Sequence, residues 1–577
     1  EFDGLETVTL TLTPKRDLEV DSMVLEIPLA DIRHYSAGVH RGRLEGRRTF
    51  DGIAHIWLAG DKIGLVWSAE SYRGWRIDSR QPRIVVEQEG AVTRLRLLLV
   101  NTAATVSAPM EIRFFRHPTP LKPMPEGYRD WRFSPGWSPH LNLWSQHNAV
   151  WNSALAKPTP RSWDVLRESV AFAREYGQRT YPFNIPLWMS HYHMRREEAP
   201  FIRPDLSREE REALADGQDR VLQERDDNRR VEEAIYFFED WNIVPPQRSG
   251  RTDVGTIYYC SPSSSYADYW AHSLEQLLVQ GGIDGIYMDL ANVNRPCFNP
   301  EKNHAYTTLD GETEGTMELV AARNFYKRLY YVLLKHRGPE GAPHMLGHGS
   351  VVPSIYTSFW GLAFMGELFK PGDWFDMTKW YLQQDLFAPR MLASPEPDAP
   401  RSYDAFVYRA LYPQAQFGIP TMILPQYSKG SADPPTQRRM NQDPALAREM
   451  LAFTFLHDQI LWPSRVHVYT VYSFWEKTRM AEWADATFHP YWSNGLATAP
   501  EAVRASYWRR EDGAHLVAVA NWSSAPVTAE WALPATAVGV DEVLDVERGE
   551  TLPAVAGRLA AEIPPHDLRV FRMGGTE

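Results

Sequence analysis

The most constraining feature of this sequence is a long central region in which short apolar strands alternate with amphipathic helices. Between residues 129 and about 490 we identify eight strand candidates, with helical candidates between most of them. This alternation predicts parallel strands, and eight such units fit a (β/α)8 barrel. The strand candidates are Leu141–Trp144, Tyr181–Ile185, Thr256–Cys260, Asp284–Asp289, His344–Gly347, Leu362–Glu367, Thr421–Leu424 and Gln459–Trp462.

The helical candidates begin with recognisable start signals. Ser162 precedes one helix, and Asp443 opens another, where Asp is a favoured N-cap and the following Pro a favoured first residue. Tyr266–Gln280 and Met317–His336 have apolar residues at helical spacing. The connection Gly349–Gly361 is short and has no clear helix, so we expect the barrel to be irregular there.

Both flanking regions have the pattern of antiparallel sheets. Short alternating segments such as Val24–Ala30 recur up to a proline-rich linker at Pro118–Pro125, and the same alternation returns near the C-terminus. This spacing predicts β-sandwiches. The predicted protein is therefore multidomain, with a central (β/α)8 TIM-like barrel at 129–495 flanked by an N-terminal β-sandwich at 1–128 and a C-terminal β-sandwich at 496–577.

Charge and hydropathy exclude several classes of partner. The formal net charge of −12 argues against nucleic acid or an anionic membrane as the main partner, because both select basic patches. No apolar run reaches the roughly 20 residues of a membrane-spanning helix. The chain starts without an initiator Met, so we expect a processed form and favour a secreted or periplasmic location over a cytoplasmic one. A homo-oligomer is compatible with the sequence, which does not define the oligomeric state.

Aromatic residues and cysteines narrow the function less sharply. The chain has 21 Trp, 26 Tyr and 24 Phe, which suits stacking on sugar rings but equally suits large cores. Its two cysteines, Cys260 and Cys297, exclude a disulfide framework and a zinc cluster. Each follows a predicted barrel strand, so two buried free thiols and a single bridge both remain open.

The stretch Gly281–Leu290, with the sequence GGIDGIYMDL, carries the strongest chemical signal. Its apolar run predicts a strand buried on both faces, and Asp289 stands at the C-terminal end of that strand. Catalytic groups of barrel enzymes stand at this end of the strands. The alternative is a structural carboxylate that caps the following loop. Asp284 begins the same strand, so we expect it to be structural.

Glu367 is the second carboxylate that ends an apolar strand. Glycoside hydrolysis needs two carboxyl groups flanking the scissile bond, which makes Asp289 and Glu367 the predicted catalytic pair. Glu367 alternatively has a structural role. Other polar and aromatic residues near the strand ends are substrate-binding candidates: Asn142, Trp144, Asn184, Trp188, His191, His193, Tyr259, Tyr287, Asn292, His348, Trp360 and Gln426.

Other kinds of chemistry have weaker support. His191 and His193 lack the third ligand that would make a metal site convincing, so no metal or cofactor is expected. His304 and Asp310, in the loop after the Asp289 strand, are either pocket-wall groups or form hydrogen bonds within the loop. No GxSxG, phosphate-binding or dinucleotide-binding motif occurs, which removes the usual support for serine hydrolase, kinase and dehydrogenase functions.

Several stretches resemble glycoside hydrolase family 123 and its uncharacterised relatives. They are the tryptophan-flanked hairpin Ile56–Trp75, the strand GGIDGIYMDL, the downstream NHAYTTLDGE, the helix RNFYKRLYYVLLKH and the GEL at Gly366–Leu368. The resemblance spans the first sandwich and most of the barrel. It implies a bacterial glycosidase that removes β-linked N-acetylgalactosamine by substrate-assisted catalysis.

In that family an Asp–Glu pair ends the fourth strand, the Asp orienting the acetamido group and the Glu acting as acid. Asp289 matches the Asp, but Leu290 stands where the Glu is expected. Two mechanisms therefore remain open. Glu367 supplies the acid with acetamido participation retained, or Asp289 is the nucleophile and Glu367 the acid/base, as in α-galactosidase-like barrels.

The sequence therefore predicts an exo-acting glycosidase that cleaves a terminal sugar from an oligo- or polysaccharide. The resemblances imply β-N-acetylgalactosamine or a galactose-type sugar, while the sequence itself does not define the sugar or its anomer. The alternative from another class is a non-catalytic carbohydrate-binding protein on a barrel scaffold, with Leu290 as the trace of a lost acid. A barrel lyase or transglycosylase is a third interpretation.

Overall fold

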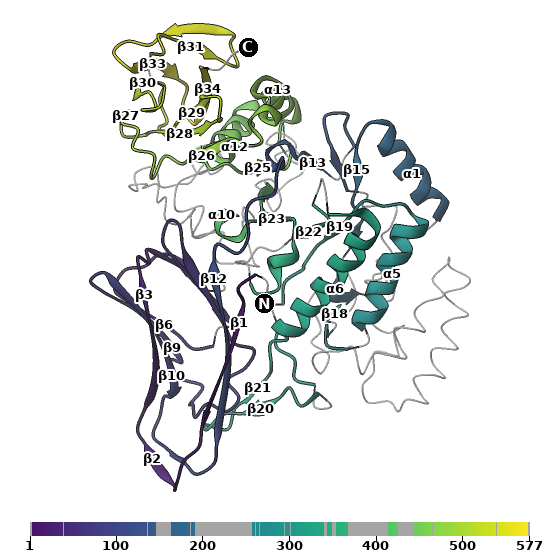
Figure 1. Ribbon diagram of the computed structural model, residues 1–577, viewed down its shortest axis with the longest axis vertical. Coiled ribbons are helices and arrows are strands. Elements are labelled where there is room, and N and C mark those ends of the chain that lie inside the picture. The colour runs from purple at the N-terminus through teal and green to yellow at the C-terminus, as the bar shows by residue number, and fades with distance from the viewer. Residues whose placement is uncertain are drawn as a thin grey trace. The chain divides into compact units, whose positions relative to one another are not determined.

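The computed structural model describes residues 3–134, 137–145, 163–190, 257–366, 414–424 and 442–574, with short gaps at 38–39, 53, 185, 260, 265, 294, 300–301, 340–342, 349–353, 464–465 and 538. The chain divides into two compact units. The first comprises Glu1–Pro123, Ser145–Gly361 and Phe406–Ile419, and the second Met124–Trp144, Leu362–Ala405 and Pro420–Glu577. Figure 1 labels many of the described elements and colours the chain by residue number. The domain boundaries at residues 128 and 495, which the sequence predicts for the barrel, stay a prediction.

The N-terminal part of the first unit consists of two antiparallel sheets that share one apolar core. Burial alternates along Met23–Ala30 and Val92–Val100, because every second side chain points to the same face. His55–Ala59 is buried along its whole length. The strand order in the first sheet is β1 (Glu6–Leu12), β12 (Met110–Thr119), β8 (Gly64–Ser68), β7 (His55–Ala59), β4 (His34–Ala37) and β5 (His40–Arg43). The strand order in the second sheet is β3 (Met23–Ala30), β10 (Val92–Val100), β9 (Ile84–Glu89) and β6 (Arg47–Phe50). A small pair, β2 (Leu18–Val20) and β11 (Ala104–Val106), extends beyond them.

The remainder of the first unit contains parallel strands and long helices. β16 (Phe183–Asn184) pairs with β19 (Ile286–Met288), which pairs with β22 (Met345–His348), both in parallel. The apolar stretch that the sequence singles out is β19, and all of its residues are buried, as predicted. The helices are α1 (Trp163–Glu175), α5 (Tyr266–Gln280) and α6 (Leu319–Arg337), with α5 and α6 packed side by side (Figure 1). Short elements of this unit are β15 (Arg179–Thr180), η5 (Thr357–Phe359) and α10 (Gln414–Phe417).

One predicted barrel strand has a different partner. β18 (Ile257–Tyr259) pairs antiparallel with β17 (Trp188–Ser190), so the prediction of a third parallel strand at Thr256–Cys260 is wrong. Instead, β16 pairs directly with β19. The physical reason is that a short apolar run predicts a strand without specifying its direction or partner. Closure of a complete eight-stranded barrel therefore remains a prediction.

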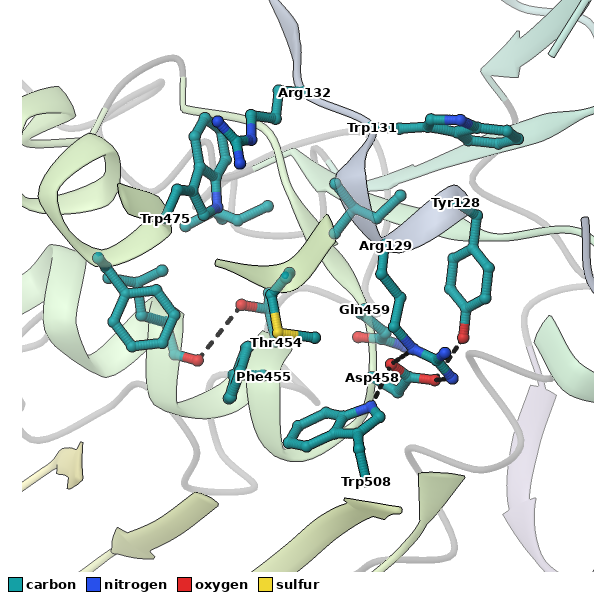
Figure 2. A pocket seen from close by; sticks show the side chains of 15 residues that line it. Tyr128, Arg129, Trp131, Arg132, Thr454, Phe455, Asp458, Gln459, Trp475 and Trp508 are labelled. Carbon is teal, nitrogen blue, oxygen red and sulfur yellow. Dashed lines mark hydrogen bonds and ion pairs between the residues drawn. The ribbon is translucent and has the colours of Figure 1, made fainter. Parts of the chain in front are cut away.

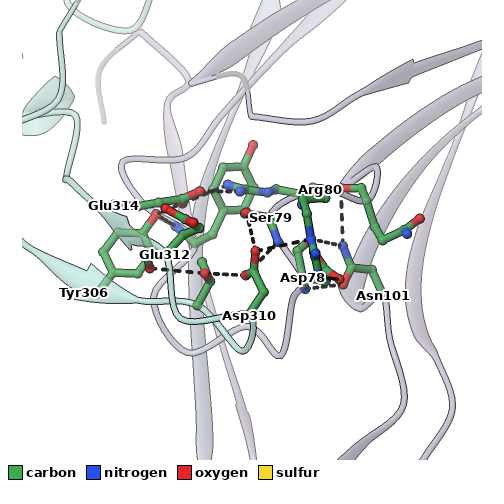
Figure 3. Close-up of polar contacts among 12 residues, drawn as sticks. Asp78, Ser79, Arg80, Asn101, Tyr306, Asp310, Glu312 and Glu314 are labelled. Atoms are coloured by element: carbon green, nitrogen blue, oxygen red, sulfur yellow. Dashed lines mark hydrogen bonds and ion pairs between the residues drawn. The ribbon is translucent and has the colours of Figure 1, made fainter.

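A long loop after β19 is fixed against the N-terminal sheets of the same unit. Its hairpin, β20 (Tyr306–Thr307) and β21 (Thr313–Glu314), lies beside the turn that carries Ser79 (Figure 3). The Ser79 hydroxyl donates to Asp310 Oδ2 at 2.6 Å, and the Ser79 backbone N–H donates to Oδ1 at 3.0 Å. The buried Arg83 guanidinium donates to Glu314 Oε2 at 2.9 Å. The N-terminal sheets thus help to hold the loop that follows the candidate catalytic strand.

The second unit has its own parallel strands and a separate pair of sheets. β13 (Phe133–Ser134) pairs with β14 (Leu143–Trp144), while β23 (Leu362–Gly366), β24 (Thr421–Leu424) and β25 (Ile460–Leu461) form another parallel set. Its helical elements are α12 (Pro444–Leu456), α13 (Val468–Thr478), η1 (Tyr128–Asp130) and η6 (Met480–Trp483). Asp443 caps α12 by accepting from the Ala445 N–H at 2.8 Å, which confirms the predicted helix start.

The C-terminal strands of the second unit form two sheets over one apolar core. Burial alternates along β33, so its apolar face meets that core. The strand order in the larger sheet is β26 (Thr487–His489), β28 (Val503–Arg509), β29 (His515–Asn521), β34 (Asp567–Met573), β31 (Glu542–Asp545) and β32 (Glu550–Pro553). The strand order in the smaller sheet is β27 (Thr498–Ala499), β30 (Val527–Ala532) and β33 (Arg558–Ile563). None of the described helices combines the length and the hydropathy needed to cross a membrane.

Candidate active site

Asp289 is placed where the chain leaves a buried parallel strand. Its backbone N–H donates to the carbonyl of Asn184, which ends the neighbouring strand β16, at 2.7 Å. The Asp289 side chain is 25% exposed. The surrounding backbone is therefore fixed by the sheet while the carboxylate remains accessible to solvent. This position agrees with the sequence prediction that Asp289 stands at a C-terminal strand end.

Two nitrogen atoms contact one oxygen of the Asp289 carboxylate. His348, at the end of β22, has its Nδ1 2.8 Å from Asp289 Oδ1 and is almost fully buried. The backbone N–H of Leu290 donates to the same oxygen at 2.9 Å. No hydrogen bond to Oδ2 occurs within the part of the chain that the structure describes. The carboxylate is thus oriented through one oxygen, Oδ1.

Tyr287 contacts the same imidazole nitrogen as Asp289, so these two groups share the single hydrogen-bonding position of His348 Nδ1. Its hydroxyl lies 2.9 Å from His348 Nδ1, and its ring lies nearly parallel to the imidazole, with the ring centres 6.2 Å apart. Tyr287 is buried in β19, one strand away from His348 in β22. Two neighbouring strands therefore supply the groups that fix the Asp289 side chain.

Immediately after Asp289, the chain turns sharply. Leu290 has φ = +49°, in the left-handed region that L-residues other than Asn, Asp and Gly rarely enter, and its side chain is substantially exposed. The Ala291 N–H then donates to the carbonyl of His348 at 3.2 Å, which returns the chain across the end of β22. The turn aims the Asp289 carboxylate away from the strand at some cost in backbone strain.

Two buried tyrosines anchor the loop that follows this turn. The Tyr326 hydroxyl, from α6, donates to the carbonyl of Ala291 at 2.5 Å. The Val293 N–H donates to the Tyr356 hydroxyl at 3.2 Å, and that hydroxyl lies 3.4 Å from Asn292 Oδ1. Burial raises the pKa of both tyrosines, so they remain protonated. Sequence reasoning did not identify these tyrosines. Tyr326 belongs to the apolar helical pattern of α6, which indicates core packing alone, and Tyr356 lies in a connection without a helical pattern.

Several of the predicted binding residues lie close to Asp289 and have different contacts. His348 contacts the Asp289 carboxylate and Tyr287 contacts His348, whereas Asn292 contacts the Tyr356 hydroxyl. Asn184 accepts from the Asp289 N–H through its backbone and donates its side-chain amide to the carbonyl of Pro182 at 3.2 Å. Trp360 is only 3% exposed. A Cβ added at Gly347 would lie 2.3 Å from the Trp360 ring, so the ring fills the space that this glycine leaves. This packing favours a structural role for Trp360.

The remaining predicted site residues lie elsewhere or outside the described residues. Asn142 and Trp144 belong to the second unit, where Asn142 accepts from the Arg132 N–H at 2.8 Å and donates to the carbonyl of Asp130 at 2.6 Å. Trp188 and Tyr259 pair across β17 and β18, but their side chains are outside the described part. Glu367, His191, His193, Gln426 and Cys260 also lie outside it. The carboxyl separation between Asp289 and Glu367 therefore remains to be measured.

A pocket in the second unit is lined by side chains that form hydrogen bonds with one another. Asp458 is buried there, with φ = +58°, and accepts from Arg129 Nε and from Trp508 Nε1, both at 2.8 Å (Figure 2). The Tyr128 hydroxyl also donates to this carboxylate. The cavity volume of about 40 Å³ has room for a few water molecules. These contacts fix η1 against the end of α12.

Comparisons with known proteins give only distant structural likeness. No protein-family model and no curated protein matches the chain. The α-galactosidase from Lactobacillus brevis is similar at 9% identity with a TM-score of 0.48, over 100% of this chain and 78% of that one. The galactosidase domain of an α-galactosidase–sucrose kinase is similar at 10% identity with a TM-score of 0.45, over 99% and 78%.

A third solved structure is a family 36 α-galactosidase from Geobacillus stearothermophilus in complex with raffinose. It is 12% identical with a TM-score of 0.45, over 99% of this chain and 79% of that one. These structural neighbours are glycosidases. Because the likeness is loose, the function of this chain has to be argued from its own residues. The resemblance to family 123 remains a prediction.

Proposed function

We propose that this protein is an exo-acting glycoside hydrolase that releases a terminal sugar from an oligo- or polysaccharide. The observation that carries the proposal is the Asp289 carboxylate, which stands at the end of buried β19 with Oδ1 held by His348 Nδ1 at 2.8 Å. A carboxylate fixed through one oxygen presents the other in a defined direction. Such preorganisation is what a nucleophile, or a group that orients a participating acetamide, requires.

Glu367 is the proposed partner that protonates the leaving oxygen. It directly follows β23, and β23 pairs in parallel with β24. Glycosidases need such an acid on the opposite side of the scissile bond from the nucleophile or base. A carboxyl separation of about 5–5.5 Å would indicate a retaining nucleophile pair, and about 6.5–9.5 Å an inverting pair. The proposed substrates are β-N-acetylgalactosaminides or galactosides.

The first prediction concerns the proposed catalytic carboxylates. Asp289→Asn and Glu367→Gln should each lower kcat on a cleavable aryl glycoside by roughly 10²- to 10⁴-fold, because each removes a group that handles charge or a proton in the transition state. Circular dichroism should show retained fold. A panel of aryl α- and β-galactosides and β-N-acetylgalactosaminides supplies the substrate.

Asp284→Asn is the matched control, since Asp284 lies in the same stretch of chain. Its Oδ2 accepts from the Thr180 N–H at 2.9 Å and so ties the start of the strand to its neighbour. This variant should lose stability but keep its kcat while folded. Full activity in both Asp289→Asn and Glu367→Gln would reject the assignment.

The same panel separates the two mechanisms and the binding-only alternative. Acetamido participation requires an N-acetylated sugar, so turnover of plain galactosides would favour Asp289 as nucleophile. Strict dependence on the acetamide would favour substrate assistance. Saturable sugar binding without release from any substrate of the panel would indicate a carbohydrate-binding protein and contradict the proposal.

A further inference from the structure

A cluster of metal-ligand side chains lies in the loop and helix start that follow the Asp289 turn. Cys297, His304 and Glu318 come from three separate segments, and their ligand atoms all lie within 4.8 Å of one another. His304 Nδ1 and Glu318 Oε1 are 3.5 Å apart. Two ligands of one tetrahedral zinc ion are separated by about 3.3–3.8 Å, as follows from metal–ligand bonds of about 2.0–2.3 Å. The cluster therefore needs little contraction to enclose an ion.

The backbone around these residues is fixed. Cys297 and Thr316 exchange backbone hydrogen bonds of 2.7 and 2.9 Å, and the Thr316 hydroxyl donates to the carbonyl of His304 at 2.7 Å. These bonds tie all three segments together near the N-terminal end of α6. The ligand-bearing side chains are thus presented by a braced framework, which reduces the ordering cost of binding an ion.

The polar atoms of the cluster have the arrangement that supports metal ligands. Ser261 and Ser263 donate to Glu318 Oε1 at 2.6 and 2.5 Å, so outer hydrogen bonds hold the carboxylate. His304 Nδ1 is buried and has no hydrogen-bond partner among the described residues. The thiol of Cys297 is free and fully buried, in agreement with the free-thiol interpretation of the sequence. A buried imidazole nitrogen without a hydrogen-bond partner is costly to leave uncompensated.

We propose that Cys297, His304 and Glu318 form a binding site for a zinc-class divalent cation. Sulfur, nitrogen and oxygen ligands together favour zinc over calcium or magnesium, which prefer oxygen alone. Three protein ligands leave a fourth position for water. On binding, the S–H bond breaks, the sulfur–metal bond forms and one proton is released to solvent. This site is independent of the proposed glycosidase activity.

Lys302 places a positive charge next to the site. Its ammonium donates to Ser261 Oγ at 2.7 Å and so lies behind the serines that hold Glu318. The Glu318 carboxylate supplies one negative charge before the cation arrives, and the Cys297 thiolate supplies a second when the thiol proton is released on binding. The Lys302 ammonium opposes the approach of the cation. Lys302→Gln should therefore tighten binding by removing a repulsive charge.

The test uses the untagged full chain after removal of metal with a chelator. Zinc titration should show one high-affinity equivalent per chain, and Co²⁺ should give thiolate-to-cobalt charge-transfer absorption with the visible bands of a tetrahedral site. Cys297→Ser should abolish the charge-transfer band, and His304→Ala should weaken zinc binding more than about 100-fold. His304 is partly exposed, so this second variant serves if Cys297→Ser fails to fold.

Two substitutions of the same residue types provide controls. Cys260→Ser removes the only other cysteine, and His272→Ala removes an exposed histidine on α5. Both should keep the cobalt spectrum and the zinc affinity of the unmodified chain. The proposal is overturned if no stoichiometric binding occurs, if Cys297→Ser keeps the charge-transfer band, or if Cys260→Ser alone removes it.

Discussion

Asp284 and Asp289 lie at opposite ends of one short stretch, and their surroundings give them different tasks. Asp284 accepts from the backbone N–H and the hydroxyl of Thr180, at 2.9 and 3.1 Å, and braces the beginning of the strand. Asp289 is held through one oxygen only and faces a sharp turn. Aspartate therefore has a structural role at the start of the strand, in Asp284, and a proposed chemical role at its end, in Asp289. The position of each residue along a parallel strand predicts this difference.

Leu290 allows the strain of that turn to be measured. A left-handed conformation costs an L-residue roughly 1 kcal/mol or more, whereas Asn enters it readily. Leu290→Asn should therefore raise the free energy of unfolding by roughly 1 kcal/mol, measured by urea denaturation. Leu309→Asn is the control, because Leu309 is also exposed in the loop after β19 but does not have a positive φ.

That control should give no gain in stability. An equal gain in both variants would show that added surface polarity, rather than relief of backbone strain, is responsible. If Leu290→Asn gains stability while kcat falls, the strained turn contributes to the position of the Asp289 carboxylate.

At the level of elements, the β20–β21 hairpin joins the long loop to the N-terminal sheets. Glu314 accepts from Arg83 Nη1 at 2.9 Å and from the Tyr306 hydroxyl at 2.8 Å. The side chain of Arg83 is only 4% exposed, so it depends on this carboxylate for its charge partner. The hairpin is therefore held by a partly buried ion pair rather than by its short backbone ladder.

Glu314→Gln should lower the free energy of unfolding by about 2 kcal/mol, because it leaves the buried Arg83 charge without its counter-charge. Thermal unfolding followed by circular dichroism measures the loss. Glu312→Gln, at an exposed position in the same hairpin, should change stability by less than about 0.5 kcal/mol. Equal effects of the two substitutions would contradict a specific role for the Arg83–Glu314 pair.

At the level of the whole molecule, buried histidines make stability depend on pH. Burial lowers the pKa of His457 from 6.5 to about 4, although its Nδ1 lies 2.7 Å from the carbonyl of Phe453. Burial also lowers the pKa of His344, His489 and His515. The folded chain therefore takes up protons less readily than the unfolded chain below pH 6.5.

This difference in proton uptake makes the free energy of unfolding fall as the pH falls. The stabilising effect of a neutral His457 is complete above the unfolded pKa of 6.5 and is lost as the pH falls from 6.5 towards about 4. Over that range the unmodified chain should lose about 3 kcal/mol more than His457→Gln, as measured by urea unfolding at each pH. His272→Gln, at an exposed position, should keep the full pH dependence. Parallel curves for the unmodified chain and His457→Gln would contradict this prediction.

Much of the local structure is encoded in short stretches of sequence. The apolar run in Gly281–Leu290 predicts buried β19, the spacing in Tyr266–Gln280 predicts α5, and Asp443 with its following Pro predicts the start of α12. Asp289 at the end of β19 follows from the same reasoning. These features depend on residues within one or two turns of the chain, so local propensity and periodicity determine them.

Pairing between distant segments was decided only by the tertiary structure. The antiparallel partner of β18 and the direct pairing of β16 with β19 are not visible in any single stretch. The same holds for His348 beside Asp289, and for the assembly of Cys297, His304 and Glu318 from three segments. The physical reason is that burial of apolar faces and satisfaction of polar groups are properties of the packed chain. The sequence by itself therefore determined which residues end the strands, and packing determined which of them meet.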